Sequence, residues 1–181
     1  MQRRRWPLWT YYVVAVFIFA LDYVTKKIID RNIEMYTERI NVIGDFFQIA
    51  HIRNRGAAFG ILENQRWLFI IITIVVVGLL IGYLHRLHRA NGRRMTLFAL
   101  GMILGGALGN FIDRSRSGEV VDFLQFNFGS YTFPLFNVAD IGITCGVALF
   151  ILDTLLTPKQ ENKPHDNGEQ PRDSASEQPS A

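Results

Sequence analysis

The chain has 181 residues, of which 49% are hydrophobic and 13% aromatic, and its formal net charge is +3. A basic chain of this size would suit nucleic acid, but its arginines and lysines flank long apolar segments instead of sharing one polar face. Composition therefore favours a membrane protein and argues against nucleic acid as a partner. The single cysteine, Cys145, can form no disulfide within the chain.

The N-terminal segment begins with three arginines, Arg3 to Arg5, and continues as an apolar run through Asp22 to Ile29. A secretory signal peptide starts in the same way, but no small-residue cleavage site follows this run. We therefore expect an uncleaved first transmembrane helix, with Pro7 in its first turn.

Three further apolar segments follow, at residues 67–84, 96–112 and 138–156. Each is near the roughly 20 residues that a helix needs to cross a hydrocarbon core of about 30 Å. The sequence thus predicts an all-α polytopic membrane protein with four transmembrane helices.

Membrane orientation follows from the arginines. Besides the N-terminal three, the short link between the second and third segments carries Arg86, Arg89, Arg93 and Arg94. Positive residues collect on the cytoplasmic side, so both termini are expected there, and the loops 31–66 and 113–137 outside.

The two outer loops carry patterns typical of β-strands. The first has β-branched and aromatic residues around a Gly44–Asp45 turn, and the second has aromatic runs around a Gly129–Ser130 turn. We expect small extracytoplasmic β elements. Alternation in the second loop places Asp122 on one face with apolar neighbours: Val120, Leu124 and Phe126.

Domain organisation is simple in this interpretation. Residues 1–157 form the four-helix membrane domain. Residues 158–181 are polar, mixed in charge and without periodicity, so we expect a disordered cytoplasmic tail.

Polar residues of three predicted helices fall at one depth. At about 1.5 Å per residue, Asp22 lies about 22 Å from the inner end of its helix, and Asn110 and Asp113 lie about 21 and 26 Å from theirs. The fourth helix begins at that outer surface, with Asn137 and Asp140. Ionisable residues at membrane depth are functional candidates, so we expect a site just inside the outer leaflet.

Each candidate also has a purely structural interpretation. Asn137 could cap the fourth helix, with Asp140 at its third position and bonded back to the backbone. Asp122 has the weaker structural explanation, because a surface acid on a strand normally faces water.

Two neighbouring pairs suggest local ion pairs. Asp113 and Arg114 could hold the end of the third helix, and this role is favoured over catalysis. Asp22 and Lys26 are four residues apart and could pair on one helix face.

Small residues supply two further features. Asn54 precedes Gly56, which would let a substrate backbone come close to the amide, although an ordinary turn is the competing explanation. Gly101, Gly105 and Gly109 form a small-residue face that favours close helix packing.

Other chemistries fit less well. Ser115 or Ser117 with a lysine would suggest a serine–lysine hydrolase, but no spacing signature supports it. His85 and His88 have a possible metal spacing, yet they lie among arginines on the predicted cytoplasmic side. No metal site is therefore predicted.

Four motifs occur in order: LDYVTK, NRGAAFG, GNFIDR-x3-G-x-VVDF and PLFNVAD. Together they resemble the lipoprotein signal peptidase (signal peptidase II) family, from the first helix to about Leu156. Arg55, between Asn54 and Gly56, leaves the fixed positions of its motif in place.

This resemblance implies an aspartic endopeptidase of the bacterial cytoplasmic membrane. We expect it to work without a cofactor, as a monomer among membrane lipids. It would remove signal peptides from prolipoproteins, cutting just before a cysteine that carries a diacylglyceryl group. The catalytic pair would be Asp122 and Asp140. The supporting positions would be Asp22, Lys26, Asn54, Gly56, Asn110, Asp113, Arg114 and Asn137.

The implied chemistry agrees with the residue types. Two nearby carboxylates can share one proton, so that one activates water and the other acts as an acid. The helix terminus favours an ionised Asp140, and the apolar strand face favours a neutral Asp122. Two rivals remain: a metal-dependent lipid phosphotransferase and a proton-coupled transporter.

Overall fold

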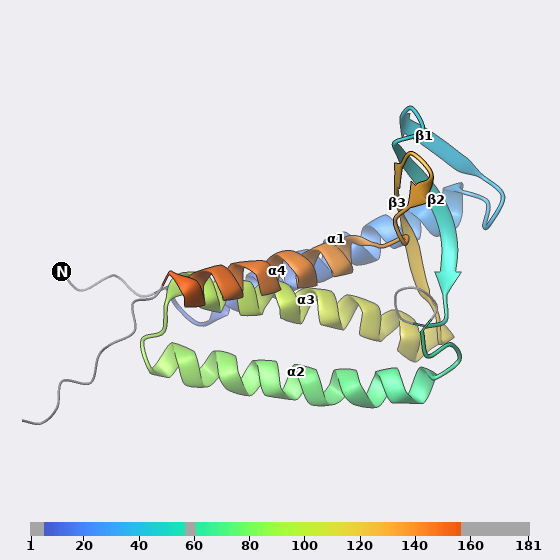
Figure 1. Cartoon of the computed structure of the whole chain (residues 1–181). Coiled ribbons are helices and arrows are strands. Elements are labelled where there is room, and N and C mark those ends of the chain that lie inside the picture. The colour runs from blue at the N-terminus through green and yellow to red at the C-terminus, as the bar shows by residue number, and fades with distance from the viewer. Residues whose placement is uncertain (1–5, 57–60, 157–181) are drawn as a thin grey trace, which may run out of the picture.

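The computed structural model describes residues 6–56 and 61–156. Four helices lie side by side, and a small sheet stands at one end of them (Figure 1). The helices are α1 (Trp9–Asn32), α2 (Arg66–Arg89), α3 (Arg94–Ser117) and α4 (Val138–Leu155). The strands are β1 (Arg39–Ile43), β2 (Phe47–Asn54), β3 (Val120–Phe128) and β4 (Tyr131–Thr132). Residues 57–60 of the NRGAAFG motif and the predicted tail lie outside the described residues.

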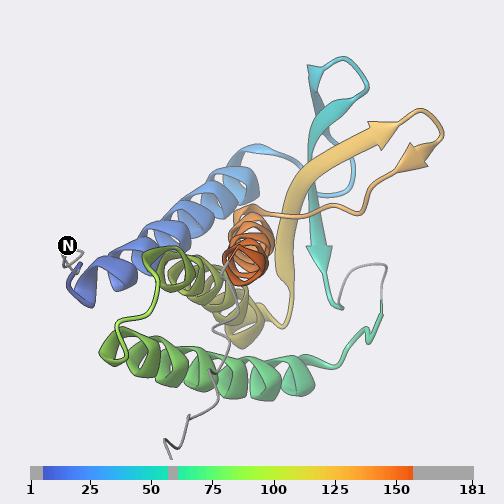
Figure 2. The same cartoon turned by 60° about the vertical axis from the view of Figure 1, so that its left-hand side comes forward.

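Helix α3 is the centre of the bundle and packs against each of the other three helices (Figure 2). Its glycines make this possible. A Cβ on Gly101 would lie 2.6 Å from the Tyr11 carbonyl oxygen of α1, and one on Gly105 would collide with the Ala15 carbonyl. Gly106 faces α4 in the same way. The predicted small-residue face is therefore a helix-packing surface.

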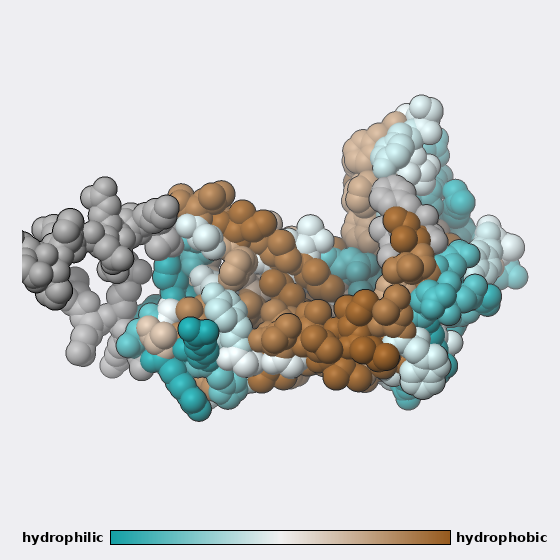
Figure 3. Space-filling view, turned by 60° about the horizontal axis from the view of Figure 1, so that its bottom comes forward, coloured by the Kyte–Doolittle hydropathy of each residue, from teal (hydrophilic) through white to brown (hydrophobic). Residues whose placement is uncertain are grey.

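The outer surface of the bundle is strongly apolar. Among the described residues, α2, α3 and α4 are long and apolar enough to cross a membrane. Within α2, all of which is described, Leu84 is the only buried residue, and most of the other large apolar side chains are exposed. A continuous hydrophobic band covers the middle of the bundle between more hydrophilic ends (Figure 3). Such a surface is suited to lipid.

The sheet is antiparallel, with strand order β1-β2-β3-β4. Both predicted hairpin turns are present, and Gly44 (φ +48°) and Gly129 (φ +63°) adopt the left-handed backbone that glycine tolerates. In the central pair, Ile52 of β2 lies opposite Asp122 of β3. The register shifts just before Ile52, which sets how the end of β2 meets β3.

Helix α3 continues beyond the predicted apolar segment 96–112 to Ser117 and ends at Gly118 in a left-handed conformation (φ +80°). Asp113 and Arg114 therefore belong to the last turns of the helix and not to the following loop. Adjacent helical residues project about 100° apart, so these two side chains reach different neighbours.

Candidate active site

Asp122 is buried in the central strand β3, with 2% of its surface exposed. Its Oδ1 accepts a hydrogen bond from Asn137 Nδ2 at 2.7 Å, and its Oδ2 accepts one from Asn54 Nδ2 at 2.9 Å. Burial is the main reason that the pKa of this carboxyl rises from 3.8 to about 6. The donor from Asn54 opposes the rise, whereas the nearby charge of Asp140 adds to it.

Asp140 occupies the third position of α4 and forms a capping box with Asn137. The Asn137 side chain accepts from the Asp140 backbone N–H at 3.0 Å, and Asp140 Oδ2 accepts from the Asn137 backbone N–H at 3.2 Å. Asp140 Oδ1 also accepts from Asn110 Nδ2 at 2.8 Å. The capping interpretation is thus correct, and it fixes one carboxylate oxygen of a residue that also lines the site.

Asn137 connects the two carboxylates and is completely buried. Its side-chain amide donates to Asp122, while its backbone amide donates to Asp140. The same Nδ2 lies 3.2 Å from Asn110 Oδ1. Asn137 therefore fixes the position of Asp122, on β3, relative to Asp140, on α4.

Lys26 is the second connecting residue and is 4% exposed. Its ammonium group lies 2.8 Å from Asp22 Oδ2, 2.8 Å from Asp113 Oδ2 and 3.0 Å from Asn110 Oδ1. The three N–H donors of the ammonium thus have three acceptors from two helices. Asn110 in turn donates a hydrogen bond to Asp140 Oδ1, so Lys26 is linked to Asp140 through Asn110.

Asp22 joins α1 to the start of α4. Its Oδ1 accepts the backbone N–H of Ala139 at 2.8 Å, an N–H of the first turn of α4 that has no partner within the helix. A Cβ on Gly109 would lie 2.5 Å from Asp22 Oδ2, so the glycine leaves the space that this buried carboxylate occupies.

Asn54 and Arg114 meet at Gly56. Asn54 Oδ1 accepts from the Gly56 N–H, and Arg114 Nη2 donates to the Gly56 carbonyl, both at 2.9 Å. The Arg114 guanidinium also lies over the Phe69 ring, 4.6 Å from its centroid. The favoured Asp113–Arg114 ion pair is therefore wrong: Asp113 pairs with Lys26, and Arg114 turns toward the loop after β2.

A cavity of about 460 Å³ opens beside the two acids. Its polar lining includes Asp122, Asp140 and Arg114, and its apolar lining comes from Phe133 to Phe136 and from the first turns of α4. We had not predicted these apolar residues. Thr144 could have been found, since it lies four positions after Asp140 on the same helix face.

The described residues hold no group of three or more histidine, cysteine or acidic side chains that could bind a metal ion. What the site does offer is two carboxylates that line one cavity, one of them with a pKa that burial raises to about 6. An apolar helical bundle with such a pair at one end is suited to acid–base chemistry at a membrane. These features define a membrane enzyme.

The chain belongs to the signal peptidase II family, whose sequence model matches residues 14–156. A lipoprotein signal peptidase of Brevibacillus brevis is 49% identical over 151 residues, which are 83% of this chain and 97% of that protein. A bacterial membrane enzyme solved by the in meso method at 2.3 Å resolution superposes with a TM-score of 0.78. It is 36% identical, and the match covers 90% of this chain and 99% of that one. A second such structure, at 1.9 Å, has a TM-score of 0.74 and 36% identity, covering 87% and 100%.

Proposed function

We propose that this protein removes signal peptides from prolipoproteins as an aspartic endopeptidase, with Asp122 and Asp140 activating a water molecule. The observation that carries the assignment is that both carboxylates line one cavity and that Asn137 donates to each of them. Membership of the signal peptidase II family supports the same activity.

In the proposed reaction, ionised Asp140 takes a proton from water as the water oxygen attacks the scissile carbonyl carbon. Protonated Asp122 gives its proton to the carbonyl oxygen, which yields a neutral tetrahedral diol. The diol then returns a proton to Asp122, and Asp140 gives its proton to the leaving nitrogen as the C–N bond breaks. The products are a signal peptide with a new carboxyl group and a mature chain with a new amino group.

The environments support this division of roles. Burial raises the pKa of Asp122 to about 6, so at any given pH more of this carboxyl is protonated than its ordinary value of 3.8 would allow. Asp140 lies at the N-terminus of α4, where the helix dipole favours a negative charge, and it accepts two N–H groups.

The remaining polar residues are proposed to position the pair and the substrate. Lys26, with its two aspartate partners, fixes Asn110 and through it Asp140. Asn54 orients Asp122, and Arg114 anchors the loop that begins at Gly56.

The substrate is proposed to be a prolipoprotein cut just before a diacylglyceryl-modified cysteine. The cavity combines carboxylates at its polar side with an apolar wall of Phe133, Phe136 and Ile141. This combination suits a peptide bond flanked by a lipid group. The Brevibacillus brevis relative carries lipoprotein in its name.

The proposed membrane arrangement has four spans, in which α1 crosses the membrane together with α2, α3 and α4. Helix α1 is 24 residues long, packs along α3, and exposes large apolar side chains, including Val13, Val16 and Phe17. Both termini are then cytoplasmic in the bacterial inner membrane, and the site lies near the outer leaflet. We also propose that residues 1–157 suffice as a monomeric peptidase and that residues 158–181 form a tail.

The test is incubation of the purified protein in detergent with a diacylglyceryl-modified prolipoprotein, with and without a chelator. The same prolipoprotein without the lipid serves as control. Conversion of the lipidated substrate to mature lipoprotein and free signal peptide, unchanged by the chelator, is the expected result. Loss of cleavage on chelation would contradict the two-carboxylate mechanism.

A further inference from the structure

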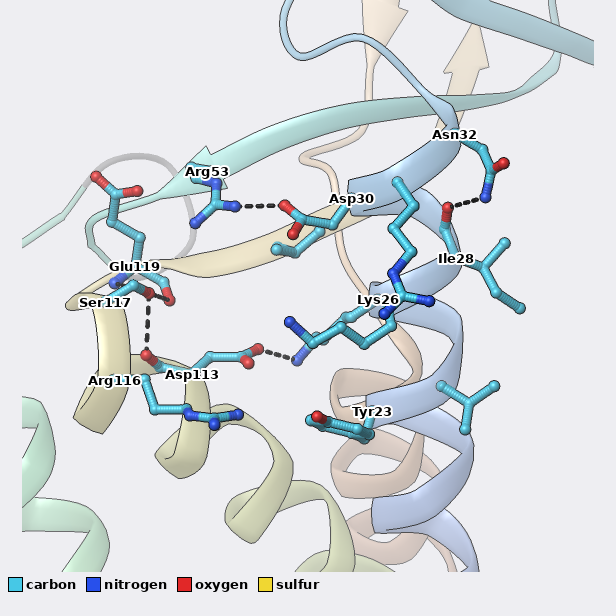
Figure 4. A pocket seen from close by; sticks show the side chains of 14 residues that line it. Tyr23, Lys26, Ile28, Asp30, Asn32, Arg53, Asp113, Arg116, Ser117 and Glu119 are labelled. Atoms are coloured by element: carbon cyan, nitrogen blue, oxygen red, sulfur yellow. Dashed lines mark hydrogen bonds and ion pairs between the residues drawn. The ribbon is translucent and has the colours of Figure 1, made fainter.

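A second cavity, of about 720 Å³, lies between the outer ends of α1 and α3, beneath the sheet. No described residue lines both this cavity and the active-site cavity. Figure 4 shows Lys26 and Arg116 reaching into it from facing helices, with Asp113 between them. Lys26 and Asp113, which form an ion pair, line this cavity and not the active-site cavity.

The cavity has an excess of positive charge. Among the described residues, five basic side chains line it, against three acidic ones: Lys26, Lys27, Arg31, Arg53 and Arg116 against Asp30, Asp113 and Glu119. Every acid is already paired, since Asp30 contacts Arg53, Asp113 contacts Lys26, and Glu119 contacts Arg55 outside the cavity.

Three of the five cations have no acidic partner in the part of the chain that the structure describes. Among the described residues, Lys27, Arg31 and Arg116 form no ion pair, although Lys27 lies over the Tyr23 ring. They come from two helices and converge on one hollow. This arrangement is complementary to an anionic group with several acceptor oxygens, such as a phosphodiester.

Beside the charged residues and the polar Asn32 and Ser117, the cavity has an apolar lining that continues along the exposed side of α1. Tyr23, Val24 and Ile28 line the cavity and are 38%, 52% and 53% exposed. On the same helix, Val13, Val16 and Phe17 are exposed farther from the sheet. A ligand with a phosphate head and long acyl chains would place its head among the cations and its chains along this face.

We propose that this cavity is a binding site for the headgroup of an anionic glycerophospholipid of the surrounding membrane. The proposal goes beyond peptide cleavage and rests only on the membrane placement given above. Arg31 and Arg116 hold the phosphate, and Lys27 contributes at the rim. Because Lys26 lines the cavity and donates to Asn110, the occupant borders the network that is proposed to position Asp140.

The test measures lipid binding to the purified, full-length protein by native mass spectrometry and by thermal stabilisation in detergent. The ligands are phosphatidylglycerol, phosphatidylcholine and inorganic phosphate. The variant is Arg31→Gln with Arg116→Gln, both exposed positions whose loss leaves the ion pairs described above intact. The control, Arg39→Gln with Arg86→Gln, removes the same charge from exposed positions outside the cavity.

Each basic residue near an anionic lipid contributes about fivefold to binding. We expect phosphatidylglycerol to bind the wild type better than phosphatidylcholine, the cavity variant to lose about 25-fold in affinity, and the control to lose less than about fivefold. Three results would overturn the proposal. These are equal binding of the two lipids, equal losses in variant and control, and stabilisation by inorganic phosphate as strong as by phosphatidylglycerol. None of these results depends on peptidase activity, so they separate this site from the proposed function.

Discussion

Replacing Lys26 by methionine tests whether its buried charge holds the site together. The change keeps the length of the side chain but leaves Asp22 and Asp113 without their common cation. Asp22 is 1% exposed and the Asp113 side chain 20%, so neither charge is well solvated. Removing one partner of a buried ion pair costs about 3–5 kcal/mol of unfolding free energy.

For a protein of this length, 1 kcal/mol shifts the melting temperature by about 2–4 °C. We therefore expect Lys26→Met to lower the melting temperature by about 6–20 °C, measured by thermal unfolding in lipid-free detergent. Lys27→Met is the matched control because its side chain is exposed, and it should shift the temperature by about 1–2 °C at most.

A rescue separates lost charge from lost shape. Changing Asp22 and Asp113 to asparagine in the Lys26→Met background removes the two orphaned charges, and the new amide oxygen on α1 can still accept the Ala139 N–H. We expect this triple variant to regain about half of the lost stability or more. A triple variant no more stable than Lys26→Met, or a Lys26→Met protein as stable as wild type, would refute the reasoning.

Three other predictions concern the acid, the helix packing and the topology. Asn54→Ala removes a donor that favours the ionised form of Asp122, so the pKa of Asp122 should rise further above its ordinary value. The high-pH limb of the kcat/KM profile should then move up by about one pH unit from its wild-type position. A limb that stays in place or moves to lower pH would contradict this role of Asn54. Gly105→Leu should disturb the α1–α3 contact and lower the free energy of unfolding by about 1–3 kcal/mol, measured by thermal unfolding. Gly82→Leu, which has open space around it, should leave the free energy of unfolding unchanged. Reporters in the α2–α3 turn and the β3–β4 turn should lie on opposite sides of the membrane, and finding both on one side would exclude four spans.

The fold was largely predictable because its strongest signals are local. Apolar segments of spanning length mark the helices, and Gly44 and Gly129 mark the two hairpin turns. The cap of α4 was also visible, since Asn137 and Asp140 have capping-box spacing. From the sequence alone, Asp140 could be either a helix-capping residue or a residue of the site. In the structure, the hydrogen bond of the cap helps to orient the carboxylate that lines the cavity.

The partners within the site were less predictable because they depend on long-range geometry. Asp113 and Arg114 are neighbours in sequence, yet one reaches Lys26 and the other reaches Gly56. The contact between Asn54 and Asp122 depends on a register shift in the β2–β3 pair, which no residue pattern specifies. The bond from Asp22 to the start of α4 joins segments more than a hundred positions apart.

The most direct test of the account is the turnover of lipidated prolipoprotein by Asp122→Asn, Asp140→Asn and the double variant, at matched amounts of membrane-inserted protein. Asparagine keeps the shape of the side chain but cannot accept and release a proton as a carboxyl group does, so each single change should lower turnover by at least about 100-fold. Because the two acids work as a unit, the double variant should be scarcely worse than either single one. Asp113→Asn should lower activity only in part, because its carboxylate binds Lys26 and does not line the active-site cavity. Substantial cleavage by either single variant would contradict the catalytic pair.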